Sequence, residues 1–138
     1  MKTTTETMTI SNTALWIGRV LAGLFTLFMV FDAVVKLLQL PQAVEPTVQL
    51  GWAATALPAI GALSLMCLVL FLIPRTSIIG AVLMTGYLGG ALASNWRAGT
   101  PAFNIIFPII IGALMWGSLL LRHPLVRAAV SSRGSFKM

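Results

Sequence analysis

Charged residues are scarce in this chain, and acidic residues are the scarcest. Only 9% of the 138 residues are charged, and the three acids are Glu6, Asp32 and Glu45. A soluble domain carries about 25% charged residues, so this chain could not cover a water-facing surface with polar groups. The scarcity of charge therefore excludes an ordinary soluble domain.

Cysteine and histidine occur once each, as Cys67 and His123. One thiol forms neither an intramolecular disulfide nor a CxxC redox motif. One histidine and one distant cysteine make neither a zinc site nor a bis-histidine haem site. The chain also lacks a Ser-His-Asp set, a carboxylate pair and a phosphate-cradling loop. We therefore predict no catalytic residues, no bound metal and no evident cofactor within the chain.

What the chain has in abundance is long apolar runs. Hydrophobic residues make up 58% of it, and a run of about 20 such residues is enough to cross a bilayer. Four runs predict membrane-spanning helices at residues 14–40, 53–73, 77–96 and 102–121. Proline and glycine separate these runs, and we expect a loop over Pro41–Pro46 and short turns at Pro74–Thr76 and Arg97–Pro101. The predicted fold class is all-α, an antiparallel four-helix transmembrane bundle.

The predicted organisation has three parts. A polar N-terminus covers residues 1–13, the four-helix transmembrane domain covers 14–122, and a basic C-terminal tail covers 123–138. The lipid bilayer is the expected surrounding. The sequence leaves open whether the chain also forms a homo-oligomer or joins a larger membrane complex.

The net charge of +6 comes from basic residues that lie mostly at the ends of the apolar runs. That distribution is typical of membrane topology and not of a nucleic-acid groove, so we expect no nucleic-acid partner. Lys36 and Arg97 fall on one side of the predicted bundle. The side of the termini holds the larger set, namely Lys2, Arg75, Arg122, Arg127, Arg133 and Lys137. The positive-inside rule then predicts both termini in the cytoplasm, with the chain in a bacterial inner membrane.

Asp32 interrupts the first apolar run, and Lys36 follows one helical turn later. An ionisable group at that depth costs roughly 2.5–3.5 kcal/mol on insertion scales, and such groups usually face protein and have a partner. Gly18 and Ala22 lie on the same helical stripe as the two charges. Small residues allow close helix packing, which predicts that this stripe faces the bundle.

Antiparallel geometry brings polar residues together at the predicted outer mouth, opposite the termini. The expected members are Asp32, Lys36, Asn95, Arg97 and Asn104. In a structural interpretation, Asp32 pairs with Lys36 or Arg97 and locks the first helix against the third. In a functional interpretation, a shallow pocket offers one carboxylate and two cations to a lipophilic ligand with polar oxygens, such as a quinone or a lipid headgroup.

On the third predicted helix, Gly86 and Gly90 form a small-xxx-small motif that lets two backbones approach closely. We interpret the motif first as helix packing within the chain. A dedicated seam with a second copy of the chain is the alternative.

The stretch Leu72–Pro101, LIPRTSIIGAVLMTGYLGGALASNWRAGTP, resembles the DoxX-like family. Trp16–Arg19, Pro58–Gly61 and Leu119–Pro124 add to the resemblance, which covers about residues 14–127. It implies a compact four-helix membrane protein. It also implies relatives that are subunits of, or associated with, membrane oxidoreductases that use quinones or handle oxidative stress.

The resemblance adds Tyr87 to the predicted cluster and Gly89 to the predicted packing residues, because both match the family pattern. Ser64 stands where relatives often have glutamate, and Asn95 where they often have histidine. Both departures remove an ionisable group and so argue against proton-coupled chemistry or metal binding. We expect either a redox-associated subunit that binds a quinone or lipid, or a non-enzymatic partner that assembles or stabilises other membrane proteins.

Overall fold

The computed structural model describes residues 11–131, and within that range every regular element is a helix. Each of four spans is long and apolar enough to cross a membrane. Their helices are α2 (Asn12–Leu37), α4 (Leu57–Leu72), α5 (Ser77–Ala98) and α6 (Ala102–Arg122). The predicted all-α bundle of four transmembrane helices is confirmed, and its limits differ from the predicted ones by a few residues.

The ends of these helices have local causes. The Ser11 hydroxyl oxygen accepts a hydrogen bond from the Ala14 N–H at 3.2 Å, which satisfies one of the N–H groups left free at the start of α2. α5 ends where Gly99 takes a left-handed conformation, with φ at 67°. Glycine adopts that conformation at little cost because it has no Cβ.

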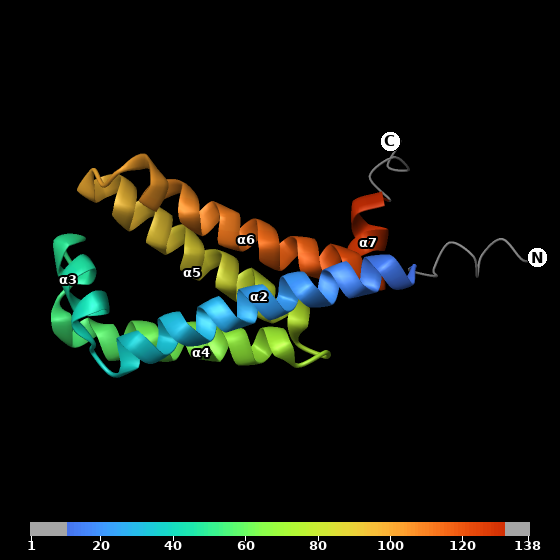
Figure 1. Cartoon of the computed structure of the whole chain (residues 1–138), viewed down its shortest axis with the longest axis horizontal. Helices are drawn as coiled ribbons and strands as arrows, with labels where there is room; N and C mark the ends of the chain where they lie inside the picture. The colour runs from blue at the N-terminus through green and yellow to red at the C-terminus, as the bar shows by residue number, and fades with distance from the viewer. Residues whose placement is uncertain (1–10, 132–138) are drawn as a thin grey trace, which may run out of the picture.

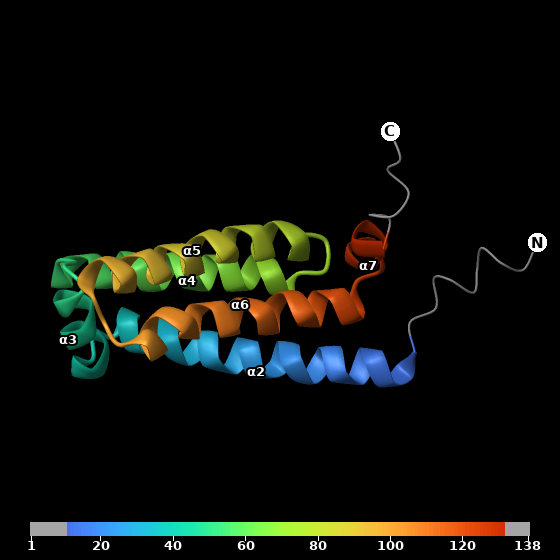
Figure 2. The ribbon, with the colours of Figure 1, turned by 90° about the horizontal axis from the view of Figure 1, so that it is seen from above.

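The four spans form a ring in which α2 and α5 each pack against both α4 and α6. Figure 1 shows α5 beside α6 and α2 beside α4, and the view in Figure 2 places α4 with α5 and α2 with α6. α2 and α5 therefore lie diagonally across the ring. One end of the bundle holds α3 (Pro41–Gln49), and we call it the α3 end. The other holds α7 (Pro124–Ser131) and the start of α2, and we call it the α7 end.

The core lies inside the ring and is apolar. Phe25 and Phe71 are fully buried, and their rings meet edge to face with centroids 5.2 Å apart. The α2 stripe predicted to face the bundle is buried at Gly18, Ala22 and Phe25. Large apolar side chains on the outer surface are exposed, including Leu27, Phe31, Ile79, Val82, Phe103 and Ile109. An apolar exterior of this kind suits a bilayer and not water.

The loop predicted over Pro41–Pro46 is wrong, because this segment forms most of α3. Pro41 is the first residue of the helix, where its missing N–H is not needed. The N–H groups of Ala43 and Val44 both bond to the Leu40 carbonyl. Pro46 removes only one internal hydrogen bond from a short helix. The two prolines therefore shape this helix without preventing it.

The predicted polar N-terminus lies outside the described residues except for 11–13. Of the predicted basic tail, 123–131 is described and includes α7, while 132–138 lies outside the described part of the chain. A short 3₁₀ turn, η1 (Ala54–Ala56), precedes α4.

Candidate ligand-binding site

Asp32 and Lys36 form an ion pair on α2, with Lys36 Nζ 2.6 Å from Asp32 Oδ2. Residues four apart lie on the same helix face, so the two side chains meet without distortion of the helix. The sequence left Lys36 and Arg97 open as partners of Asp32, and in the structure the partner is Lys36.

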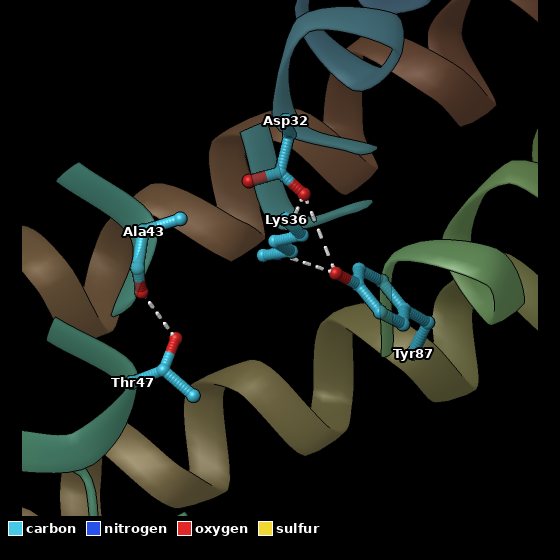
Figure 3. Close-up of polar contacts among 5 residues, drawn as sticks. All are labelled: Asp32, Lys36, Ala43, Thr47 and Tyr87. Atoms are coloured by element: carbon cyan, nitrogen blue, oxygen red, sulfur yellow. Dashed lines mark hydrogen bonds and ion pairs between the residues drawn. The ribbon is translucent and has the colours of Figure 1, made fainter. Parts of the chain in front are cut away.

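Tyr87 joins this pair from α5, across the diagonal of the ring. The Lys36 ammonium donates a hydrogen bond to the Tyr87 hydroxyl oxygen at 2.6 Å, and the Tyr87 hydroxyl donates to Asp32 Oδ2 at 3.3 Å. Figure 3 shows the three side chains pointing toward one another. We call Asp32, Lys36 and Tyr87 the polar triad. It links two helices that lie opposite each other in the ring.

The polar triad is only partly shielded. The side chain of Lys36 is 18% exposed and that of Asp32 is 25% exposed. The ion pair is therefore neither a surface contact nor a sealed core pair, and a molecule outside the bundle can reach it.

α4 makes room for the triad through small residues. Gly61 lies against Lys36, since a Cβ built on Gly61 would be 3.0 Å from the Lys36 Cβ. One turn farther along, Ser64 is fully buried. Its hydroxyl makes no hydrogen bond of good geometry, although it interacts electrostatically with Tyr87. The position that departs from the family pattern thus lies beside the triad.

An apolar groove opens between α4 and α5 and reaches two members of the triad. Its volume is about 470 Å³. Its lining includes Lys36 and Tyr87 of the triad and Thr47 from α3. The remaining walls are mainly apolar or small: Leu50, Trp52, Ile60, Leu63, Met66, Cys67, Leu83, Gly86, Gly90, Ala91 and Ser94. We call this cavity the α4–α5 groove.

The segment after α3 closes one end of the groove and is tied to α5 by two hydrogen bonds. The Trp52 indole N–H donates to the Ser94 hydroxyl at 3.2 Å, and the Arg97 guanidinium donates to the Leu50 carbonyl at 2.9 Å. Gly51 lies between these contacts with φ at 91°, a value that L side chains rarely adopt. The loop thereby folds back over α5.

Three predicted members of the cluster lie at the α3 end but make other contacts. Arg97 bonds to Leu50, as described above. The Asn95 side chain donates to the Ala91 carbonyl at 2.9 Å and accepts from the Thr100 hydroxyl at 3.0 Å, so it helps to close the end of α5. Asn104 is exposed near the start of α6. Arg97 and Asn95 thus bond to groups other than Asp32, and the convergence of the whole cluster with Asp32 stays a prediction.

The predicted packing residues divide into two groups. Gly18 and Ala22 are buried on α2, and a Cβ on Gly18 would be 3.1 Å from the Leu121 Cβ on α6. By contrast, a Cβ on Gly86, Gly89 or Gly90 would meet nothing within 4 Å. These three glycines do not mediate packing within the chain, so that interpretation of the motif is wrong.

The close approach between α4 and α5 occurs instead at Gly80, whose added Cβ would overlap the Phe71 backbone. Sequence reasoning did not single out Gly80. Its position in the first turn of α5, directly after the tight Pro74–Thr76 turn, was the available signal. Within residues 11–131, no three His, Cys, Asp or Glu side chains gather to hold a metal ion.

Comparison with known families gives one match. The sequence model of the DoxX-like family matches residues 20–118, which include the polar triad and all the lining residues of the α4–α5 groove. No curated protein and no solved structure shows significant similarity to this chain.

Proposed function

Because the chain belongs to the DoxX-like family, we propose that it is a redox-associated membrane subunit that binds a quinone in the α4–α5 groove. The observation that carries this proposal is a mainly apolar groove that has Lys36 and Tyr87 of the polar triad among its lining residues. Ligand sites are commonly apolar cavities with a few convergent polar groups. A quinone has the matching chemistry, an apolar body with carbonyl oxygens.

Lys36 is the residue we assign to the ligand head group. An ammonium has three N–H donors, and the bonds to Asp32 and Tyr87 use two of them. The third is available for a carbonyl oxygen. Asp32 holds the ammonium in place and balances its charge, so the groove presents a fixed donor without a net charge at the polar end.

The family supports a quinone in preference to another lipid, since it includes proteins associated with quinone-using oxidoreductases. In this role the chain supplies the quinone site, and a partner oxidoreductase supplies the electrons. We place the protein in a bacterial inner membrane with both termini in the cytoplasm. Arg19, Arg75, Arg122 and Arg127 support that orientation, because they belong to the α7 end of the bundle.

The test is native mass spectrometry of the purified protein loaded with a ubiquinone. We expect the wild type to retain quinone and Gly90→Leu to lose it. Gly90 lines the groove and nothing lies within 4 Å of an added Cβ, so the leucine side chain has room to start into the groove. Gly89→Leu is the matched control, since Gly89 is equally open but does not line the groove. No retention by the wild type, or equal retention by Gly90→Leu, would contradict the proposal.

The polar end of the groove is tested by Tyr87→Phe. This variant removes one hydroxyl and leaves the Asp32–Lys36 pair in place. Because the Tyr87 hydroxyl is one of the two partners that hold the Lys36 ammonium in place, we expect a less well placed donor and roughly tenfold weaker affinity for the quinone. Unchanged affinity would show that the quinone head group does not reach the polar triad.

A second candidate function is assembly or stabilisation of another membrane protein. The uncovered face of Gly86, Gly89 and Gly90 favours it, because small residues let a partner helix approach closely. A partner helix would contact Gly89 as well as Gly90. Loss of a co-purifying partner in both leucine variants would support assembly, whereas loss of quinone in Gly90→Leu alone supports the ligand site.

A further inference from the structure

A second cavity has its charged end at the α7 end of the bundle and runs along α2 from Arg19 to Val30. It has a volume of about 450 Å³, and its lining comes from α2, α4 and α6. Arg19 and Arg122 provide its charged groups, and Gly23, Leu27, Val30 and Leu72 provide much of its apolar surface. We call it the arginine groove.

Within residues 11–131, the two guanidiniums in the arginine groove form no ion pair with an acid. Their charges repel each other. The acids within residues 11–131 are Asp32 and Glu45, and these belong to the last turns of α2 and to α3, at the α3 end. Two adjacent cations that face a cavity without a counter-charge favour an anionic ligand.

Arg122 is held in position by its surroundings. Its aliphatic stem passes Gly18, where a Cβ would stand 2.5 Å from the Arg122 Cγ. Its guanidinium carbon lies 5.9 Å from the centre of the Phe71 ring. Its Nε is buried and has no hydrogen-bond partner among the described residues. A guanidinium held in this way beside the cavity presents its terminal N–H groups in the planar arrangement that suits phosphate oxygens.

The apolar part of the arginine groove has the length of a lipid chain in one leaflet. From Arg19 to Val30 the α2 axis rises roughly 16 Å, which is close to half of a hydrocarbon core of about 30 Å. Gly23 lies midway with nothing within 4 Å of an added Cβ. An acyl chain can therefore lie flat against the helix at this glycine.

We propose that the arginine groove binds an anionic phospholipid. Arg19 and Arg122 bind the phosphate, and one acyl chain lies along α2 over Gly23. The site is independent of the quinone proposal, because its two arginines lie at the opposite end of the bundle from Lys36 and it shares no lining residue with the α4–α5 groove.

The experiment compares phosphatidylglycerol with phosphatidylcholine of the same acyl chains, each titrated into the detergent-purified protein and followed by native mass spectrometry. We expect roughly tenfold tighter binding of phosphatidylglycerol, because both lipids carry the phosphate but the choline cation of phosphatidylcholine is repelled by the two guanidiniums. Arg122→Gln should abolish this preference. Arg75→Gln is the matched control, since Arg75 is an exposed arginine in the turn at the same end and does not line the groove. If Arg122→Gln does not fold, Arg19→Gln takes its place.

Two further measurements show whether the phosphate belongs to a lipid or is free inorganic phosphate. Gly23→Leu should weaken phosphatidylglycerol binding, since the leucine occupies the acyl path. Inorganic phosphate alone should not raise the thermal stability of the wild type. Equal binding of the two lipids, or an equal loss in Arg75→Gln and Arg122→Gln, would overturn the proposal. Stabilisation by inorganic phosphate with no effect of Gly23→Leu would show a free-phosphate site and overturn the lipid assignment.

Discussion

Gly61 on α4 lies directly against Lys36 on α2, so that a Cβ at position 61 would be 3.0 Å from the Lys36 Cβ and 3.1 Å from the Ala33 carbonyl oxygen. Neither neighbour can move easily, because one is the first atom of a side chain and the other is backbone. The absence of a side chain at Gly61 is therefore what lets α4 pack beside the triad. This contact connects the packing of the bundle to the position of the ammonium in the groove.

We predict that Gly61→Ala destabilises the protein by about 1–3 kcal/mol, the range for overpacking a close contact. It should also weaken quinone binding, because α2 must shift and carry Lys36 with it. Thermal unfolding in mild detergent and quinone retention measure the two effects. Gly89→Ala is the matched control. It adds the same methyl group where nothing lies within 4 Å, and it should leave both properties unchanged or slightly raise stability. Equal behaviour of the two variants would contradict the role of Gly61.

The four spans could be predicted from the sequence, because the length and apolar content of a segment are enough to identify a membrane-spanning helix, whatever it packs against. The Asp32–Lys36 pair could also be predicted, since residues four apart on a helix share a face. Tyr87 could not be placed by spacing, because it meets Lys36 across the diagonal of the ring. Only the family resemblance pointed to it.

The role of the Gly86–Gly90 motif and the partner of Arg97 could not be predicted from the sequence, because each depends on which other segment of the chain lies nearby. The Gly86–Gly90 motif shows that a close approach is possible, but only the arrangement of the helices shows whether another helix is there. Arg97 has a long side chain that can reach several groups, and it bonds to the Leu50 carbonyl because the segment after α3 folds back over α5. The position of that segment depends on α3, and the prolines at 41 and 46 led to the prediction of a loop in place of this helix.

The charge balance of the triad gives a second prediction. Asp32→Asn leaves the Lys36 ammonium partly buried without a counter-charge. Breaking a fully buried pair costs about 3–5 kcal/mol, and because both side chains are partly exposed, we expect a smaller loss of about 1–3 kcal/mol. The double variant Asp32→Asn/Lys36→Met removes the isolated charge and should be more stable than Asp32→Asn alone. Chemical unfolding in detergent measures both, and a double variant no more stable than the single one would contradict this account.

The hydrogen bond that closes the groove gives a third prediction. Ser94→Ala removes the acceptor of the Trp52 indole N–H. The bond is exposed, so we expect a loss in stability of no more than about 1 kcal/mol. Quinone should nevertheless leave several-fold faster, because the loop over the groove opens more often.

Stopped-flow recovery of tryptophan fluorescence after dilution of bound quinone measures the release rate. Thr85→Ala is the matched control. It removes a similar bond from the Trp116 indole N–H, which is 2.9 Å long and lies outside the α4–α5 groove. The release rate should be that of the wild type in Thr85→Ala. A similar acceleration in both variants would point to general loosening of the bundle.

The last prediction concerns orientation, and the single cysteine makes it simple to test. Cys67 is buried, and Cys67→Ala provides a background without thiols. In that background, Glu45→Cys places a thiol on an exposed position of α3, and Ser131→Cys places one on an exposed position of α7. If the arginine-rich α7 end is cytoplasmic, a membrane-impermeant maleimide added to intact cells should label position 45 and reach position 131 only after permeabilisation. The reverse labelling pattern would show that the protein has the opposite orientation in the membrane. The quinone site would then face the cytoplasm, and the phospholipid of the arginine groove would have to come from the opposite leaflet.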